Sequence, residues 1–463
     1  MNQKSADVVI CGAGIAGVAT AYYLAQQQGI HNVLIIDKHP PLMQTTAKSG
    51  ENYRNWWPSN VMAQFMNRSI VLMDALADQS GNVFNMERRG YVYVSCNSGM
   101  DIHGYIDHHR QLDIGPIRTH AGVDGRDTLY TPPTNQGYKN EPDGADILVN
   151  SELIQQVFPH LTHDAQVVIH ARQGGAISAQ QLGVYMLDEA KTLGVQEVRG
   201  EVVAILHDAQ GVSAVDVVVD GMRERIETRA FVNAAGPFAS HIAAMLDIDL
   251  PMSSVLQQKI AIRDVHSVIP RNAPFTIFMD SQHLEWSDQE RAELASDSVL
   301  SHLLDEFPGG LHIKPEGGED SEWIKLGWAI NRTPEDPLWE PPIMEEFPDL
   351  MLRGASRLVP GLRHYVERLP KPVVHYAGYY PRTEENLPLI GPMDPLGNIK
   401  GVFIVGALSG FGTMAGCAAG ELAAAWVAGQ TEMPSYTKPL SLARYDEPGY
   451  LDSILGTQLD GQL

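Results

Sequence analysis

Residues 6–17 read Ala-Asp-Val-Val-Ile-Cys-Gly-Ala-Gly-Ile-Ala-Gly, an apolar run that stops at three spaced glycines before a helical pattern begins. Gly12 permits the tight turn from strand to helix, Gly14 lets the backbone approach a pyrophosphate, and Gly17 lets the helix lie close to the sheet. The free N–H groups and the dipole at the start of the helix then face the phosphates. This stretch predicts a dinucleotide site.

A second predicted strand supports the dinucleotide site. The run Asn-Val-Leu-Ile-Ile at residues 32–36 ends at Asp37, which follows Gly17 by twenty positions. An acidic side chain at this spacing accepts hydrogen bonds from ribose hydroxyls and disfavours the extra phosphate of NADP. Three glycines alone are weak evidence, but strand, glycines, helix, strand and acid occur here in the required order.

Composition narrows the class of protein. The chain has 463 residues, enough for two or three domains, and its 44% hydrophobic and 19% charged residues are ordinary for a globular enzyme. The net charge of -23 argues against nucleic acid and anionic lipid as partners, because both need a basic face. We see no apolar run long enough to span a bilayer, no signal-like segment and no paired cysteines. We therefore expect a soluble cytoplasmic protein.

Periodic patterns predict two amphipathic helices and one long irregular segment. Helices are expected after Ser59 and after Ser178, ending at Gly81 and Gly194. Residues 97–144 lose all periodicity, which indicates a functional lid, an oligomer contact or a partly mobile insert. The insert contains four histidines, namely His103, His108, His109 and His120. No CxxC or HExxH spacing accompanies them, so we predict no metal site.

A second strand-glycine-helix device is predicted near the C-terminus. A buried strand at residues 402–406 runs into the glycine loop 409–412, and a helix of small residues follows at 414–428. The strand at residues 229–233 also ends in small residues, as strands do where they pass close to a ligand.

The chain between Pro251 and Pro372 has a different character. Its strand candidates at residues 255–262, 275–279 and 323–328 alternate or carry aromatic side chains. This pattern predicts a predominantly antiparallel substrate domain.

Together these motifs resemble the D-amino-acid-oxidase superfamily of FAD enzymes, in particular its glycine oxidase, sarcosine oxidase and dimethylglycine dehydrogenase members. The resemblance is carried by the N-terminal glycines with Asp37, the strand 231–236, the run 378–383 ahead of 387–392, and the loop 409–412. The motifs span most of the chain in the correct order, and the insert lies outside them.

The resemblance implies an α/β fold with a Rossmann-type FAD-binding domain and a second, mainly antiparallel β substrate domain, both discontinuous in sequence. The FAD-binding domain would comprise residues 1–82, 170–250 and 373–440. The substrate domain would comprise residues 83–169 and 251–372, with the insert at about 97–144. Residues 441–463 would form a C-terminal tail.

The resemblance also implies that FAD binds in an extended pose. The expected FAD-binding residues are Gly12, Ala13, Gly14, Ile15, Ala16, Gly17, Asp37, Lys38, Thr45, Thr46, Lys48, Ser49, Val202, Ala235, Gly236, Arg382, Gly410, Phe411, Gly412, Thr413 and Met414. Sarcosine oxidases place a flavin-linking cysteine where this chain has Gly378. Dimethylglycine dehydrogenases carry a linking histidine after the second strand, where this chain has only Thr-Thr-Ala-Lys-Ser at 45–49. We therefore expect non-covalent FAD.

The sequence also offers candidates for catalytic and substrate-binding residues. The catalytic candidates are Lys325, Arg382 and Tyr379, and the substrate candidates are Arg54, Lys259 and Arg332. Lys325 lies in a run that resembles the strand with which sarcosine oxidases place a lysine over the flavin, where an ammonium stabilises nascent superoxide. Packing of its stem on neighbouring aromatic rings is the alternative. Sarcosine oxidases hold the substrate carboxylate with a basic residue where this chain has Met414.

The predicted activity is oxidation of a C–N bond in a small amine or amino acid, with hydride transfer to flavin N5 and hydrolysis of the imine. Oxygen or an electron-transfer protein would accept the electrons, and an oligomer is possible. A 2-hydroxy-acid oxidoreductase and a flavin-bearing assembly protein without turnover are the alternatives, because a fold alone does not separate them.

Overall fold

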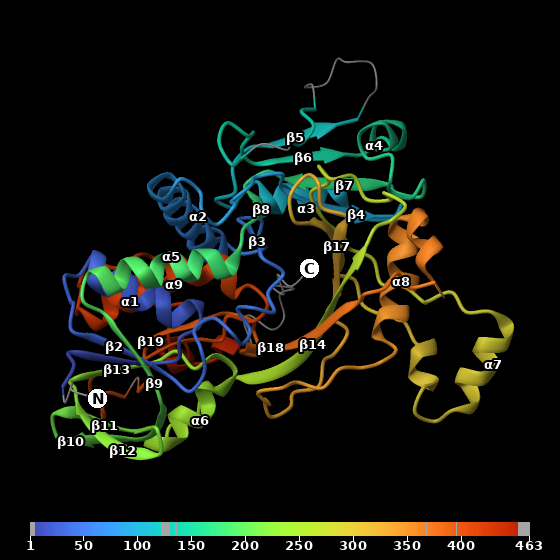
Figure 1. Cartoon of the computed structure of the whole chain (residues 1–463). Helices are drawn as coiled ribbons and strands as arrows, with labels where there is room; N and C mark the ends of the chain where they lie inside the picture. The colour runs from blue at the N-terminus through green and yellow to red at the C-terminus, as the bar shows by residue number, and fades with distance from the viewer. Residues whose placement is uncertain (1–4, 122–129, 135–136, 367, 395, 452–463) are drawn as a thin grey trace.

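The computed structural model describes residues 5–121, 130–134, 137–366, 368–394 and 396–451. The chain folds into two lobes, which Figure 1 shows connected by two long strands, β14 (Ser253–Arg263) and β18 (Val374–Arg382). No described helix is long and apolar enough to cross a membrane.

The first lobe is built on a six-stranded sheet in the order β19-β20-β13-β1-β2-β9. Five of these strands are parallel, and β19 lies antiparallel at one edge. The strands are β1 (Val8–Cys11), β2 (Val33–Asp37), β9 (Gln196–Arg199), β13 (Ala230–Asn233), β19 (Leu389–Pro392) and β20 (Val402–Gly406). This is the Rossmann-type lobe that the N-terminal motif predicts.

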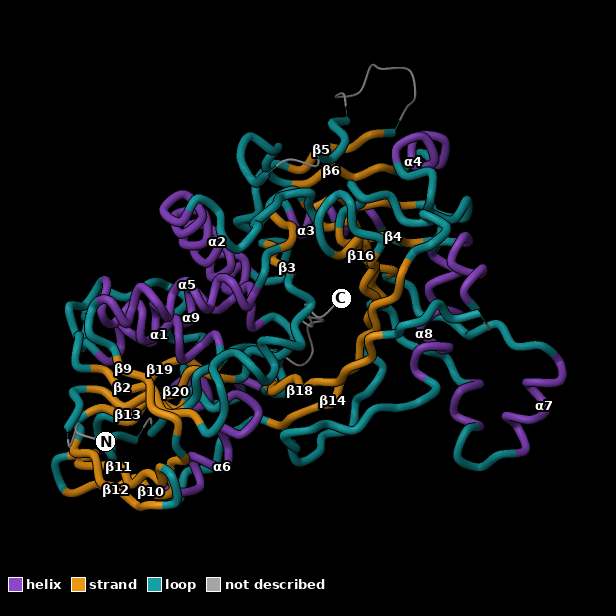
Figure 2. Tube along the Cα trace, in the orientation of Figure 1, coloured by secondary structure: helices purple, strands orange, loops and turns teal. Residues whose placement is uncertain are grey.

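Both faces of this sheet are covered, as Figure 2 shows. One face carries α1 (Ile15–Gln26), α5 (Ala179–Thr192) and α9 (Gly412–Val427). The other carries the antiparallel strands β10 (Glu201–Asp208), β11 (Gly211–Val219) and β12 (Met222–Glu227), with α6 (Ala239–Ala243) beside them. Val8 and Ile10 pack in the cluster with the helices, whereas Val9 packs with the small sheet. Burial on both faces explains the unbroken apolar run in β1.

The second lobe contains a nine-stranded sheet in the order β18-β14-β17-β16-β15-β4-β7-β6-β5. Its other strands are β4 (Tyr91–Ser95), β5 (Ile117–His120), β6 (Ala145–Leu148), β7 (Val167–Ala171), β15 (Phe275–Phe278), β16 (Leu311–Glu316) and β17 (Trp323–Trp328). The pairs β15–β4 and β5–β6 are parallel and the remaining pairs are antiparallel. The predicted mainly antiparallel second domain is confirmed.

The remaining elements surround the junction or the outer side of this sheet. They are β3 (Asn52–Arg54), β8 (Gly174–Ala176), α2 (Asn60–Ser80), α3 (Ile102–His109), α4 (Ser151–Val157), α7 (Asp288–Ser296) and α8 (Phe347–Leu358). The predicted start of α2 is confirmed, because the Ser59 side chain accepts from the N–H of Met62 and the helix ends at left-handed Gly81. Figure 1 shows α7 projecting away from both lobes.

Two features differ from the sequence-based expectations. The sequence of residues 198–206 predicts a single strand, but the structure divides it at Gly200 into β9 and β10, which belong to different sheets. The strand β18, which the predicted boundaries assign to the FAD-binding domain, pairs with β14 in the large sheet.

Helix α3 of the insert 97–144 packs on one tryptophan, Trp56. Helix α3 places His109 parallel to Trp56, with ring centroids 4.6 Å apart, and the Trp56 indole N–H donates to the Tyr105 hydroxyl at 3.1 Å. Residues 122–129 and 135–136 of the insert, like 452–463 of the predicted tail, lie outside the described chain.

Candidate functional site

The glycine loop after β1 is held by Asp37. One carboxylate oxygen of Asp37 accepts from the N–H of Ala13 and the other from the N–H of His39, both at 2.8 Å. Gly12 has a φ of +111°, and a β-carbon there would lie 2.3 Å from the carbonyl oxygen of Ala234. Only glycine therefore fits at this turn, and Asp37 fixes the loop as well as facing the ligand side.

The start of α1 is arranged to receive an anion. The helix has no acidic residue in its first turn and Gly14 gives it no side-chain cap. Thr46, from the loop after β2, accepts from the N–H of Ile15 at 3.1 Å. The remaining free N–H groups and the helix dipole favour a phosphate at this end.

Three adjoining cavities extend from this loop toward the second lobe. The first, the Asp37 cavity, has a volume of about 390 Å³. It is lined by Gly12, Gly14, Asp37, Lys38, His39, Thr45, Thr46, Val202, Ala235, Gly236, His241 and Trp339, among others.

The second, the central cavity, lies between the two glycine loops. It is lined by Gly14, Ile15, Ala16, Thr45, Thr46, Lys48, Ser49, Gly236, Lys259, Gly378, Tyr379, Tyr380, Gly410, Gly412 and Thr413, among others. It shares Gly14, Thr46 and Gly236 with the Asp37 cavity, so the two cavities adjoin. The hydroxyls of Ser49 and Thr413 lie 2.6 Å apart and join its two sides.

The third, the Arg54 cavity, lies where the central cavity meets the large sheet. It shares Ser49, Lys259 and Gly410 with the central cavity. Its other walls include Glu51, Arg54, Trp57, Tyr91, Phe275, His312, Phe411 and Met414.

Arg54, like Lys259, is a buried cation that lines this third cavity. It comes from β3, is only 5% exposed, and its guanidinium carbon lies 4.7 Å from the ring centre of Trp57 and 5.3 Å from that of Tyr91. The ring faces stabilise the positive charge and exclude water from one side of it. The side chain is therefore placed to bind an anion in a water-poor site.

His312 supplies a neutral hydrogen-bond acceptor beside Arg54. Burial, and then the charge of Lys259, lower the pKa of His312 to about 3. Its Nδ1 lies 3.0 Å from the carbonyl oxygen of Gly310, which can only accept, so Nδ1 carries the proton. Its Nε2 is then an acceptor, and it lies over Gly327, where a β-carbon would be 2.3 Å away.

Two lysines on neighbouring strands differ in their surroundings. Lys259 lines both the central and the Arg54 cavities, and its ammonium donates to the Tyr380 hydroxyl at 3.1 Å. Lys325 is bound by two carboxylates, those of Glu51 at 3.1 Å and Glu316 at 3.2 Å. Lys325 is not among the described residues that line these three cavities.

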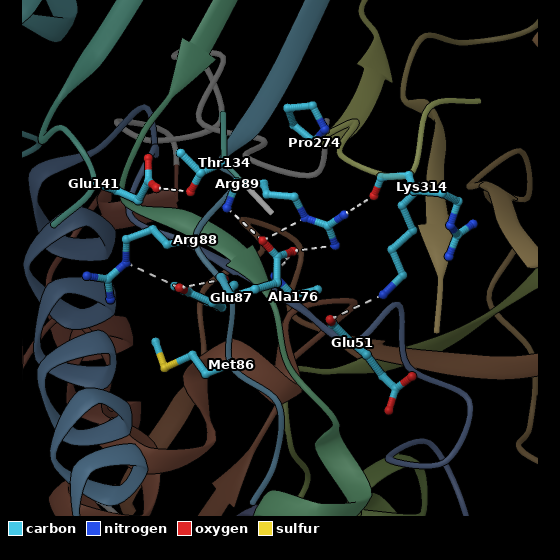
Figure 3. Close-up of polar contacts among 12 residues, drawn as sticks. Glu51, Met86, Glu87, Arg88, Arg89, Thr134, Glu141, Ala176, Pro274 and Lys314 are labelled. Atoms are coloured by element: carbon cyan, nitrogen blue, oxygen red, sulfur yellow. Dashed lines mark hydrogen bonds and ion pairs between the residues drawn. The ribbon is translucent and has the colours of Figure 1, made fainter. Parts of the chain in front are cut away.

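The Lys325 ion pairs belong to a buried network below the Arg54 cavity. Figure 3 shows Lys314 reaching the carbonyl oxygen of Glu51, and Lys314 also pairs with Glu316 at 3.3 Å. Burial alone would lower the pKa of Lys325, but Tyr376, Glu316 and Glu51 raise it above the usual range. Lys325 is therefore a permanently charged member of a compensated cluster.

Comparison with known proteins agrees with this geometry. Residues 7–426 match the model of the FAD dependent oxidoreductase family. The chain belongs to that family.

Relatives in sequence are distant. The chain is 32% identical over 97 residues to the sarcosine oxidase subunit beta of Arthrobacter sp, a match covering 21% of this chain and 24% of that protein. It is 20% identical over 397 residues to human mitochondrial dimethylglycine dehydrogenase, covering 84% of this chain and 39% of that protein. The chain thus matches well under half the length of these relatives.

Solved structures share the fold over nearly the whole chain. The L-proline dehydrogenase of P. horikoshii superposes with a TM-score of 0.71 at 17% identity, covering 96% of this chain and 98% of that one. The glycine oxidase of Geobacillus kaustophilus gives 0.70 at 18% identity, covering 96% and 99%. These likenesses establish the predicted two-domain architecture.

The cofactor of this FAD-dependent family is FAD, and the residues present fit it. The Asp37 cavity offers a ribose-binding carboxylate, and the start of α1 offers N–H groups for a pyrophosphate. The start of α9 at Gly412 reaches the central cavity as a second such end. Residues that would contact FAD therefore extend from Asp37, through the central cavity, to the Arg54 cavity.

The predicted FAD-binding residues gather in these cavities with a few exceptions. Phe411 and Met414 line the Arg54 cavity rather than the central one. Ala13 acts through its N–H on Asp37, and Gly17 lies against Gly12, whose carbonyl oxygen would be 2.0 Å from a β-carbon there. Arg382 lines a separate cavity.

That separate cavity also contains Arg332, so these two candidates lie together but away from the cavities described above. Its other lining residues include Thr383, Glu384 and Tyr445. Tyr379 has a buried ring at the wall of the central cavity, and burial followed by the nearby Glu335 carboxylate raises its pKa.

Several lining residues carried no sequence signal. His312, Trp57 and Phe275 come from strands or loops whose neighbours are set by sheet pairing, and Trp339 comes from a proline-rich segment 300 positions after His39. The described residues contain no group of three or more His, Cys, Asp or Glu that could hold a metal ion.

Proposed function

We propose that this chain oxidises the C–N bond of a small amino acid or N-substituted amino acid whose carboxylate binds Arg54. FAD, when bound, supplies the hydride-accepting centre. The observation that carries the proposal is a buried arginine in an aromatic-walled cavity that adjoins the central cavity of an FAD-dependent family. Glycine oxidase and iminodiacetate oxidase, which share the fold, act on molecules of this class by their names.

The charge around the cavity supports a carboxylate. Arg54 and Lys259 both line it, whereas the carboxylate of Glu51 is occupied by Lys325 and by the N–H of Ala179. With His312 neutral, the site carries an excess of positive charge in a water-poor environment, which favours an anionic group.

His312 gives the amine its own contact. The neutral ring of His312 lines the same cavity as Arg54, so we infer that it contacts the amine of the substrate while Arg54 holds the carboxylate. Two fixed points orient the bond between carbon and nitrogen, which is the contribution that positioning makes to such a reaction.

We assign the cation that promotes electron transfer to oxygen to Lys259 rather than Lys325. Lys259 is 5% exposed, lies at the junction of the central and Arg54 cavities, and is held by a neutral hydroxyl. The charge of Lys325 is already balanced by two carboxylates, which leaves little field for a nascent anion.

A 2-hydroxy-acid substrate is the second candidate, because His312 also offers an acceptor to a hydroxyl group. The test is anaerobic mixing of the FAD-loaded protein with amino acids, N-methyl amino acids, simple amines and 2-hydroxy acids, following the loss of flavin absorbance. Rapid bleaching by a carboxylate-bearing amine supports the proposal. Bleaching by 2-hydroxy acids alone, or by no compound although dithionite reduces the flavin, would overturn it.

A further inference from the structure

We propose that a strap from the second lobe, residues 331–344, completes the cofactor site by covering the adenosine half of FAD with Trp339. This inference depends on FAD binding and is independent of the proposed substrate. The strap follows β17 and leads to α8, and most of it has no regular secondary structure.

Both ends of the strap are fixed to β14. The side-chain amide of Asn331 donates to the carbonyl of Leu256 at 2.8 Å, and Gln257 donates back to the carbonyl of Asn331 at 2.9 Å. At the other end the N–H of Met344 donates to the side-chain carbonyl of Gln258 at 2.8 Å. The segment between these anchors therefore has a defined path.

The middle of the strap reaches the first lobe. The indole of Trp339 stacks on His39, with ring centroids 3.4 Å apart and planes inclined by 14°. The side-chain amide of Gln44 donates to the carbonyl of Trp339 at 2.9 Å. His39 is in turn held by Asp37 through its own N–H, so the stacked pair has a fixed place relative to the predicted ribose-binding carboxylate.

The stacked pair forms part of the Asp37 cavity. Both Trp339 and His39 line it, and its volume of about 390 Å³ is the space next to the residues that receive the ribose and pyrophosphate. An aromatic base is the part of FAD that lies beyond the ribose, and base-aromatic contact is favourable whatever the base. The geometry therefore assigns Trp339 to the adenine end and not to the flavin end.

Because Trp339 belongs to the strap, it connects the adenine end of the cofactor site to the second lobe, which a residue of the first lobe could not do. Since β14 anchors the strap and also carries Lys259 at the central cavity, FAD bound under Trp339 contacts the second lobe near both of its ends. Loss of the indole should weaken the adenosine contact without changing the flavin contact.

The test compares ligands that contain different halves of FAD. Apoprotein is titrated calorimetrically with FAD and with ADP, for the wild type and for Trp339→Ala, Trp339→Phe and Leu338→Ala. Trp339→Ala is expected to weaken the binding of both ligands by the same factor. That factor is about ten- to a hundred-fold, the effect of losing one base-aromatic stack. Trp339→Phe should recover part of the loss, and the neighbouring Leu338, 56% exposed, is the matched control that should change neither.

Unequal losses decide against the inference. If Trp339→Ala weakens FAD but leaves ADP unchanged, the indole acts on the flavin half or through the fold. If neither ligand is affected, the strap is only a connection between lobes. Thermal unfolding of the apoprotein variants shows whether the indole supports the fold itself, and an apoprotein midpoint that falls with FAD affinity would likewise overturn the assignment.

Discussion

Replacing Arg54 by methionine tests the substrate site most directly. Methionine keeps a long side chain among Trp57 and Tyr91 and removes only the charge and the donors. Each charge-assisted hydrogen bond in such a place contributes about 1.5–3 kcal/mol, and a guanidinium makes two to a carboxylate. Because Arg54 is 5% exposed, water does not replace them. The expected loss of about 3–6 kcal/mol weakens binding of the amino acid by about 10² to 10⁴.

The assay is anaerobic titration of flavin bleaching, with the amino acid and with the matching amine that lacks the carboxylate. Arg54→Met should weaken binding of the amino acid by the full factor of about 10² to 10⁴ and leave binding of the amine nearly unchanged. A conservative Arg54→Lys variant should fall between, since it keeps the charge but not the paired geometry. If both ligands lose affinity equally, Arg54 maintains the shape of the cavity and does not bind a carboxylate, and the proposed substrate class is refuted.

Four further predictions concern other parts of the site. Lys259→Met should slow the reaction of reduced enzyme with oxygen by about 10² to 10³, while Lys325→Met changes it much less; stopped-flow reoxidation measures both, and the opposite order would restore Lys325 as the oxygen-activating lysine. Asp37→Ala should bind FAD about ten- to a hundred-fold more weakly, because the ribose-facing carboxylate and its hydrogen bonds to the N–H groups of Ala13 and His39 are lost; flavin content after dialysis measures this. In the wild type, acid should release all the FAD, and colour that stays with the polypeptide would disprove non-covalent binding. Since the pKa of His312 is about 3, kcat/KM should show no histidine step between pH 5 and 8, and a step near 6.5 that disappears in His312→Gln would show that the ring titrates there.

The dinucleotide end could be predicted because its signal is local. Gly12, Gly14 and Asp37 lie within one strand-helix-strand unit, so their order in sequence fixes their order in space. The closing loop at Gly410 is predictable for the same reason, as a strand, a turn and a helix in succession.

The substrate end depends on pairings that no local pattern contains. In the large sheet, Lys259 is opposite Gly327 and Lys325 is opposite Ala261, so a shift of two residues decides which lysine reaches the cavity. One of the two carboxylates that pair with Lys325 belongs to Glu51, which precedes it by 274 positions. Arg382 was expected beside the flavin, yet it lies at the end of β18 next to Ser253, where the strand has left the central cavity.

One short segment connects the cofactor and the substrate. Thr46 holds the start of α1, Ser49 meets Thr413, and Arg54 lies in the third cavity, all within nine residues. Successive side chains of an extended strand point to opposite faces, so one residue inserted within β3, which pairs with β8, would turn Arg54 away from its cavity. The length of this segment is therefore constrained, whereas side chains other than Thr46, Ser49 and Arg54 can be replaced. A new substrate preference can come from replacing residues along it, but a change in its length would separate recognition from chemistry.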